Sequence, residues 1–240
     1  MKSKIILILC AICLLGTYQK ANSQAALLVL ILGDKIASEN FHLSLDGGIN
    51  VSNMNGFSDG KALIGPNFGL GVHIKLNENW YLAPEFKPLS IKGVRDVENP
   101  IDLANEFVGS EIKSKIILSH IEIPLLIRYR LNNGLYFSGG PQVSFLTYAH
   151  QKTNIVLTDG TIVSVDQDLK NDFESIDFSF PLEIGYAFKN PRGGKGMDIR
   201  VRYSYGFNEI FDSNVNQSAN HSTFQFILAF PFVEHSEEGN

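Results

Sequence analysis

Apolar and polar residues alternate with a period of two in eight separate stretches of the chain. In the stretch SHIEIPLLIRYR (119–130), the odd positions from Ile121 to Tyr129 are apolar or aromatic, whereas the even positions include Glu122, Arg128 and Arg130. Successive side chains of a β-strand point to opposite faces, so this strand has one apolar face and one charged face. A half-buried strand of a soluble β-sandwich has the same pattern as a strand whose apolar face meets lipid, and the rest of the chain must decide between them.

The length of the stretches favours the membrane. The other seven cover residues 41–51, 64–76, 80–89, 134–148, 176–189, 197–208 and 222–232. A tilted strand needs about 9 to 11 residues to cross a bilayer, whereas strands of globular proteins are typically about 5 to 6 residues long. Stretches of this length are therefore typical of membrane-spanning strands.

The connections between the stretches alternate strictly between short and long. NEN, NNG and NPRGG are tight turns, and the intervening connections are long and polar. Transmembrane barrels have short periplasmic turns and longer outer loops. The sequence thus predicts an all-β fold, an eight-stranded antiparallel up-and-down transmembrane β-barrel over residues 41–232. We expect the loop at 159–175 to extend as a hairpin above the membrane. For the loop at 94–115 we expect a short helical turn with Asn99 as its cap.

The two ends of the chain lie outside this pattern. Residues 1–23 carry two early lysines, a short apolar core and a small-residue site, and we interpret them as a cleaved export signal. Both cysteines lie within it, so the mature chain would have no thiol and no disulfide. Residues 24–40 lead into the first strand, and their sequence is equally consistent with a short helix, an extended segment or a plug. Residues 233–240 are a polar C-terminal tail.

Several strand motifs resemble a known family. HIEIPLLIRYR, GLYFSGGPQVSFL and RVRYSYGFNEIF, followed by the aromatic ending FQFILAFPF, are similar to the PorT-like outer-membrane β-barrel family, over roughly residues 41 to 232. The resemblance implies a location in the outer membrane of a Gram-negative cell and assembly by the barrel-insertion machinery. It also implies, for some members, a part in protein secretion. It supplies no catalytic residue.

The charged faces are expected to point into the barrel. Eight strands enclose a lumen just wide enough for side chains to fill, and charges buried there must be paired. The tight turns place Glu183 opposite Arg202, Arg128 near Ser138 and Arg130 near Tyr136. We predict a lumen ionic network that comprises Glu85, Lys87, Glu122, Arg128, Arg130, Glu183, Arg200 and Arg202. The prolines within the stretches (Pro66, Pro84, Pro124, Pro141, Pro181 and Pro231) each remove a hydrogen-bond donor, and we expect β-bulges there.

Composition narrows the function further. The net charge is −5 and no basic stripe is visible, which argues against a nucleic-acid partner. The six histidines show no metal-ligand spacing, and no cofactor or catalytic motif is present. We therefore expect a non-enzymatic protein with a structural, surface-binding or secretion-accessory role. Its partners would be outer-membrane lipid and a protein held by the outer loops. A lipid-modifying barrel enzyme and an exported soluble β-sandwich remain as alternatives.

Overall fold

A computed structural model describes residues 40–57, 59–97, 111–157, 159–188, 196–212, 215 and 218–232. Its elements are β1 (Phe41–Met54), β2 (Lys61–Lys75), β3 (Trp80–Val97), β4 (Glu111–Arg130), β5 (Leu135–Gly139), β6 (Gln142–Val156), β7 (Ile162–Asp168), the 3-10 helix η2 (Lys170–Asp172), β8 (Ile176–Phe188), β9 (Met197–Gly206) and β10 (His221–Phe232). In this part of the chain, no helix is long and apolar enough to cross a membrane.

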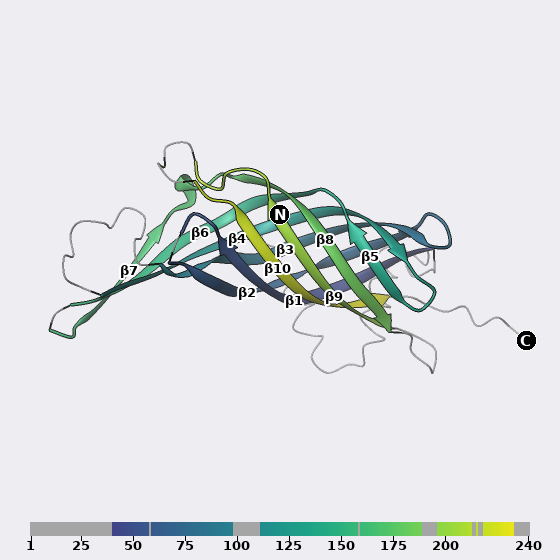
Figure 1. The fold of residues 1–240 in the computed structure, drawn as a ribbon, viewed down its shortest axis with the longest axis horizontal. Helices are drawn as coiled ribbons and strands as arrows, with labels where there is room; N and C mark the ends of the chain where they lie inside the picture. The colour runs from purple at the N-terminus through teal and green to yellow at the C-terminus, as the bar shows by residue number, and fades with distance from the viewer. Residues whose placement is uncertain are drawn as a thin grey trace, which may run out of the picture.

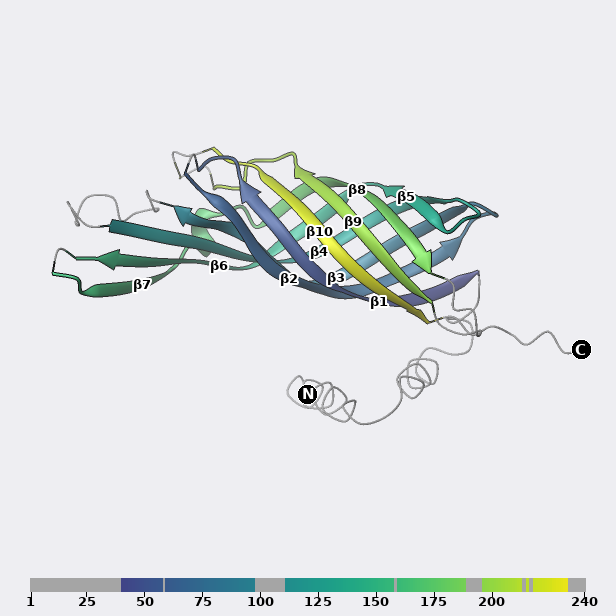
Figure 2. The ribbon, with the colours of Figure 1, turned by 60° about the horizontal axis from the view of Figure 1, so that its bottom comes forward.

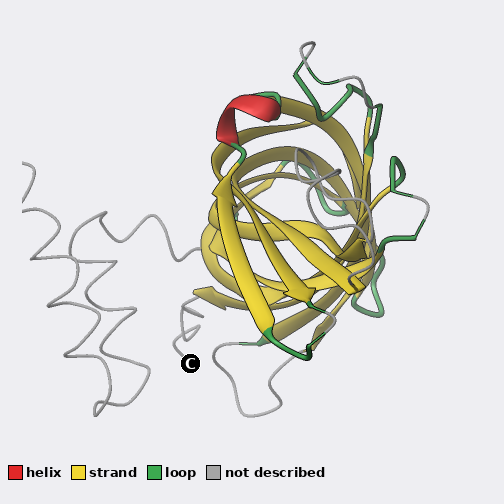
Figure 3. Ribbon diagram, turned by 90° about the vertical axis from the view of Figure 1, so that its left-hand side faces the viewer, coloured by secondary structure: helices red, strands yellow, loops and turns green. Residues whose placement is uncertain are grey.

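The strands close into a ring of antiparallel neighbours, seen end-on in Figure 3. β1 pairs with both β2 and β10, so the first and last strands join the two ends of the sheet. β5 and β6 share one place in the wall, because each pairs with β4 on one side and with β8 on the other. β7 pairs with β6 and lies outside the ring. The eight predicted stretches thus correspond to eight places in an antiparallel up-and-down barrel.

The apolar face of each strand points away from the barrel axis. On β10, for example, Phe226 and Phe230 are each 47% exposed, whereas Gln225 between two such positions is 1% exposed. Large apolar side chains remain on the surface only where they contact another apolar phase. The outward band is therefore the lipid-facing surface of the barrel, and the inward face contains polar and charged groups.

The prolines affect the ladder less than expected. Pro66 lies within a register shift between β2 and β3, and Pro141 lies in the break between β5 and β6. The bulges expected at Pro84, Pro124, Pro181 and Pro231 are absent, since these residues keep regular partners in the ladders. A missing N–H removes one hydrogen bond to one neighbouring strand, and pairing continues on both sides of the gap.

Two bulges instead reverse the inward and outward positions within a strand. In β3 an extra residue at Pro88–Leu89 moves the buried set from Lys87 to Ser90. In β6 an extra residue at Thr147 has the same effect. The alternation through residues 134–148 predicts Tyr148 on the inward face, and this is wrong: beyond the bulge its side chain is 39% exposed to the outside.

The two ends of the barrel differ as predicted. At one end, tight turns join β2 to β3 and β4 to β5, where Asn77 accepts a hydrogen bond from the amide of Trp80 (3.0 Å) and Asn133 from that of Leu135 (3.1 Å). At the other end, β3, β4 and β6 run on well beyond their neighbours, and β7 completes the expected hairpin (Figures 1 and 2). We refer to the outer ends of β2, β3, β4 and β6, together with β7, as the outer sheet.

An apolar core lies inside the outer end of the barrel. Inward residues of the long strands, such as Ile116 and Leu118, pack there against the loop residues Phe173, Ile210 and Phe211. Phe173 and Phe211 also form an isolated β-bridge, which ties the loop after η2 to the loop after β9. We call these residues, with the others buried beside them, the outer apolar cluster.

Several expectations concern residues outside the described ranges. They are the signal at 1–23, the lead-in at 24–40 apart from its last residue, the helical turn capped by Asn99, the turn at 190–194 and the tail at 233–240.

Candidate functional site

The centre of the lumen is filled by ionised side chains from five strands. Each lies at an inward position of the two-residue alternation, so the fold itself brings residues more than a hundred positions apart into contact. The ion pairs connect five cations with five carboxylates: Lys87, Lys92, Arg128, Arg200 and Arg202 with Asp46, Glu85, Glu122, Glu183 and Asp198.

Arg202 of β9 donates three hydrogen bonds to carboxylates, more than any other cation of the network within the described residues. It is fully buried and donates from Nη2 to Glu183 Oε2 (2.6 Å) and to Glu85 Oε1 (2.7 Å). Its Nε also donates to Glu183 Oε2 (3.0 Å). Hydrogen bonds between ionised groups are shorter and stronger than neutral ones. Arg202 therefore binds β8 and β3 together across the lumen.

Arg200, two residues earlier on the same strand, extends the network to β1. Its Nη2 forms an ion pair with Asp46 Oδ2 (2.5 Å), and its Nη1 donates to Glu85 Oε1 (2.7 Å). Glu85 thus accepts from two guanidinium groups at once. Both arginines are 0% exposed, so no water screens these contacts.

Arg128 of β4 forms the end of the network nearer the tight turns. It donates to Glu183 Oε1 (3.1 Å) and to the hydroxyl of Ser138 (3.1 Å), and its guanidinium lies 4.1 Å from the centre of the Tyr136 ring. The Tyr136 hydroxyl in turn donates to Asp198 Oδ2 (3.2 Å). Each polar group of Arg128 that faces the lumen is thus near a carboxylate, a hydroxyl or an aromatic face.

A second branch leads toward the outer end. Lys87 lies 3.6 Å from Glu85 and donates to Gln225 Oε1 (3.2 Å), and Gln225 donates to Glu122 Oε2 (3.2 Å). Glu122 then pairs with Lys92 at 2.6 Å. This branch therefore connects β3, β10 and β4 through Lys87, Gln225 and Glu122.

Comparison with known proteins identifies the family of this chain. The outer membrane protein beta-barrel domain matches residues 19–212. The chain belongs to this family. It therefore lies in the outer membrane of a Gram-negative bacterium, and the soluble β-sandwich is the wrong interpretation, since its core would be apolar rather than ionic.

Three solved structures to which the chain is similar are distant from it in sequence. Ail, the attachment invasion locus protein of Yersinia pestis, is 15% identical, with a TM-score of 0.38 over 79% of this chain and 97% of that chain. OprG from Pseudomonas aeruginosa is 13% identical, with a TM-score of 0.37 over 82% and 98%. AlkL is 8% identical, with a TM-score of 0.41 over 85% and 95%. Comparison with curated proteins found no match.

The register that the tight turns predict is observed in this member of the outer-membrane family. Glu183 pairs with Arg202 in the β8–β9 ladder, and Arg128 pairs with Ser138 in the β4–β5 ladder. Arg130 pairs with Tyr136 as expected, but the predicted place of Arg130 in the network needs correction. Its side chain is half-buried at the last residue of β4, and no ion pair within the described residues includes it. It lies one rung beyond Arg128, at the rim of the barrel.

Three members of the network were not predicted. Asp46 and Asp198 occupy inward positions that the alternation assigns correctly, but the register of the tight turns placed no cation opposite either of them. Lys92 lies beyond the predicted end of its strand and after the bulge at Pro88–Leu89. The local pattern of apolar and polar residues shows neither that β3 extends this far nor that its alternation shifts at the bulge.

The buried histidines complete the inward face. His42 and His73 stack at 4.6 Å, and His120 lies edge-on to His221 at 5.6 Å. His73 also lies 3.1 Å from Arg128 and 3.0 Å from Ser44. Within the described ranges, no group of three or more histidine, cysteine, aspartate or glutamate side chains is placed to hold a metal ion.

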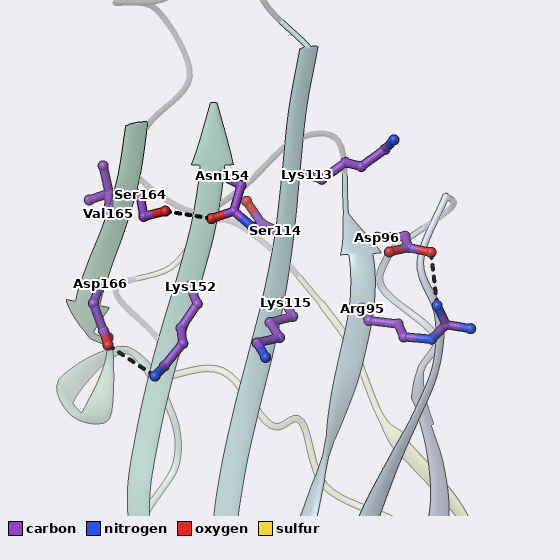
Figure 4. Close-up of a pocket in the computed structure, with 10 residues that line it drawn as sticks. All are labelled: Arg95, Asp96, Lys113, Ser114, Lys115, Lys152, Asn154, Ser164, Val165 and Asp166. Atoms are coloured by element: carbon purple, nitrogen blue, oxygen red, sulfur yellow. Dashed lines mark hydrogen bonds and ion pairs between the residues drawn. The ribbon is translucent and has the colours of Figure 1, made fainter. Parts of the chain in front are cut away.

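The outer sheet carries the other concentration of charge. A hollow of about 570 Å³ opens on it, lined by residues of β3, β4, β6 and β7 (Figure 4). On β7, Asp166 accepts a hydrogen bond from His150 (2.7 Å) and lies 3.3 Å from Lys152. The hydrogen bond from His150, followed by the interaction with Lys152, lowers the pKa of the Asp166 carboxyl. Asp166 is therefore a fixed negative charge at the edge of this hollow.

Proposed function

We propose that this protein is a sealed, non-enzymatic outer-membrane barrel that presents a binding surface, the outer sheet, outside the cell. The observation that carries the proposal is the filling of the lumen. Five buried cations are matched by five carboxylates in its centre, and the outer apolar cluster lies beyond them. A path for solutes through an eight-stranded barrel would need most of these side chains to move.

The outer sheet is the part of the molecule that the membrane does not require. β4 has 20 residues and β3 has 18, whereas a tilted crossing needs about 9 to 11. The extra length, together with the β6–β7 hairpin, projects from the end opposite the tight turns (Figure 2). Segments that a rigid scaffold holds outside the membrane are common sites of binding.

Two measurements test this proposal. Purified protein in planar bilayers should give no steps of conductance, whereas an open porin in the same bilayers should. An epitope inserted after Asp159, in the hairpin turn, should bind antibody on intact cells. The same epitope inserted after Asn133, in a tight turn, should bind only after the outer membrane is permeabilised. Stable conductance from the unaltered protein would refute the sealed barrel.

A secretion-accessory role is the finer form of this proposal. It is supported by the resemblance of the strand motifs to the PorT-like branch, which is narrower than the family that the chain matches. Deleting the gene and profiling the secreted proteins tests it. Loss of specific exported proteins, restored by the unaltered gene, would support the role, and an unchanged profile would leave the barrel with surface binding alone.

One observation bears on the alternative of a lipid-modifying enzyme. His150 and Asp166 form an outward pair near the membrane interface, which resembles a general base and the carboxylate that orients it. Within the described residues, however, no hydroxyl forms a hydrogen bond with His150. Replacing His150 by alanine and measuring deacylation of membrane lipid would test this alternative, because an enzyme would lose its activity.

A further inference from the structure

Charged side chains occupy the same rung of five consecutive strands of the outer sheet. Lys61 of β2 pairs with Arg95 of β3, Arg95 with Lys115 of β4, Lys115 with Lys152 of β6, and Lys152 with Asp166 of β7. All five side chains are exposed, from 66% for Lys61 to 47% for Lys152. We call the first four residues the cation row.

Such a row is unfavourable unless anions neutralise it, because like charges at directly opposite positions of a sheet repel each other. Carboxylates are present only at its two ends within the described residues. Asp96 pairs with the two cations at one end (3.1 and 3.2 Å), and Asp166 pairs with Lys152 at the other (3.3 Å). Lys115, in the middle, has a cation on each side, and no ion pair of the described residues includes it.

The hollow of about 570 Å³ lies along this row. Its residues come from β3, β4, β6 and β7, and Figure 4 shows Lys115 between the two groups of ion pairs. Lys113 adds another cation and Asn154 a side-chain amide to its lining. Four cations and two carboxylates line it, although the whole chain has a net charge of −5. The hollow therefore has the charge and the donors to hold an anionic group.

The height of the row above the membrane identifies the class of ligand. Tyr129 marks the level of the tight turns, where its ring contacts Trp80, and Tyr148 lies level with Ser119 near the outer end. Ten residues of β4 separate these levels, which is about 23–27 Å along the membrane normal at a tilt of 35–45°. This agrees with the apolar band of about 25 Å that aromatic girdles flank in such barrels.

The cation row lies a short distance above the outer girdle. Lys152 follows Tyr148 by four residues of β6, which places Lys152 about 9–11 Å further out by the same geometry, and its neighbour Lys115 within about 3 Å of that height. The residues immediately below it on this face, Ile117 and Ile91, still belong to the apolar side. A row at this height on the lipid-facing side of the sheet meets the headgroups of the outer leaflet before it meets any dissolved molecule.

We infer that the cation row binds the phosphate groups of the anionic glycolipid in the outer leaflet. Lys115 and Lys152 contact one phosphate in the hollow, and Arg95 and Lys113 lie within reach of the sugar or of a second phosphate. The bound glycolipid neutralises the row and fixes the outer sheet relative to the membrane surface. The inference rests on the proposed external position of this sheet.

The test measures binding of lipid A to the full chain in zwitterionic detergent by native mass spectrometry. The double variant Lys115→Gln, Lys152→Gln should lose affinity about 25-fold, which is roughly fivefold for each cation removed. Lys170→Gln, an exposed lysine of η2 outside the row, is the matched control and should bind normally. Asp166→Asn should bind more tightly, because it removes the carboxylate that competes for Lys152. A boiled and unboiled gel comparison confirms that each variant is folded.

The lipid itself supplies the second set of controls. Lipid A stripped of its phosphates should bind no better to the unaltered chain than to the double variant. Equal binding of lipid A to all variants would overturn the inference. Binding of soluble dextran sulfate that depends on the row, without any preference for lipid A, would also overturn it, since the surface would then recognise dissolved glycans. None of these results depends on conductance, so the sealed barrel and the lipid site stand or fall separately.

Discussion

Replacing Arg202 by methionine tests the central claim that paired charges hold the lumen together. Methionine retains much of the volume of the side chain but removes three charge-assisted hydrogen bonds to Glu183 and Glu85. Breaking a buried ion pair by removing one partner generally reduces stability by about 3–5 kcal/mol, because it leaves an uncompensated charge. In the variant, Glu183 still forms an ion pair with Arg128, and Glu85 still forms one with Arg200. We therefore expect a loss of stability at the lower end of this range, about 3 kcal/mol.

The assay is equilibrium unfolding in urea with the protein in phosphatidylcholine vesicles. Trp80, the single tryptophan, faces lipid at the level of the tight turns, so its fluorescence reports the loss of the barrel. Arg95→Met is the matched control, because Arg95 is 52% exposed and should contribute little. Adding Glu183→Gln to Arg202→Met restores the charge balance. The double variant should therefore be more stable than the sum of the two single changes by about 0.5–3 kcal/mol.

Equal losses of stability in Arg202→Met and Arg95→Met would refute the reasoning. The network would then be a consequence of the alternation and would not contribute to stability. A large loss in Arg202→Met without any coupling to Glu183 would refute the pairing, although burial of the arginine would still matter.

Three further predictions test other parts of the structure. Gly185→Ala should lower the free energy of unfolding, because a Cβ at this position would collide with the Tyr136 ring. Urea unfolding measures the loss. Gly47→Ala is the control, since a Cβ at Gly47 meets no atom within 4 Å. Lowering the pH below about 4 should reduce the protection of β7 amides from hydrogen exchange, relative to their intrinsic rates at the same pH. The contribution of Asp166, whose pKa the hydrogen bond from His150 lowers, is present above its unfolded pKa and is lost as the carboxyl becomes protonated. An environment-sensitive probe at Ile123 should report hydrocarbon and resist aqueous quenchers, and ready quenching would place that face in water.

Much of the barrel follows from the sequence because two rules of β-structure act locally. The period of two decides which side chains face inward, and a tight turn fixes the register of the strands it joins. Together they predicted that Glu183 and Arg202 would face each other, as the β8–β9 ladder shows. The signal at 1–23 lies outside the described residues and stays a prediction.

The errors came from features that have no local signal. One extra residue at Pro88–Leu89 and another at Thr147 reverse the alternation, so Lys92 joined the network unexpectedly and Tyr148 pointed outward. Pro84, Pro124, Pro181 and Pro231 left the ladders regular, because each removes only one hydrogen bond.

The cation row could not be predicted from the sequence, for a different reason. The sequence has no basic stripe, since the four members of the row are 20 to 37 positions apart along the chain. Only the long-range register of four strands puts them on one rung. The charged residues can be read from the sequence, but their gathering at one place on the surface depends on how all the neighbouring strands pair.

The joining of β1 to β10 has a consequence for biogenesis. Asp46 enters the lumen on the first strand, whereas Arg200, with which it pairs, arrives on the next-to-last. A chain that still lacks β9 leaves Asp46 without this cation, so the ion pair between the first strand and the next-to-last can form only when the two ends of the sheet meet. Closure of the wall and neutralisation of the Asp46 carboxylate therefore belong to one step of assembly.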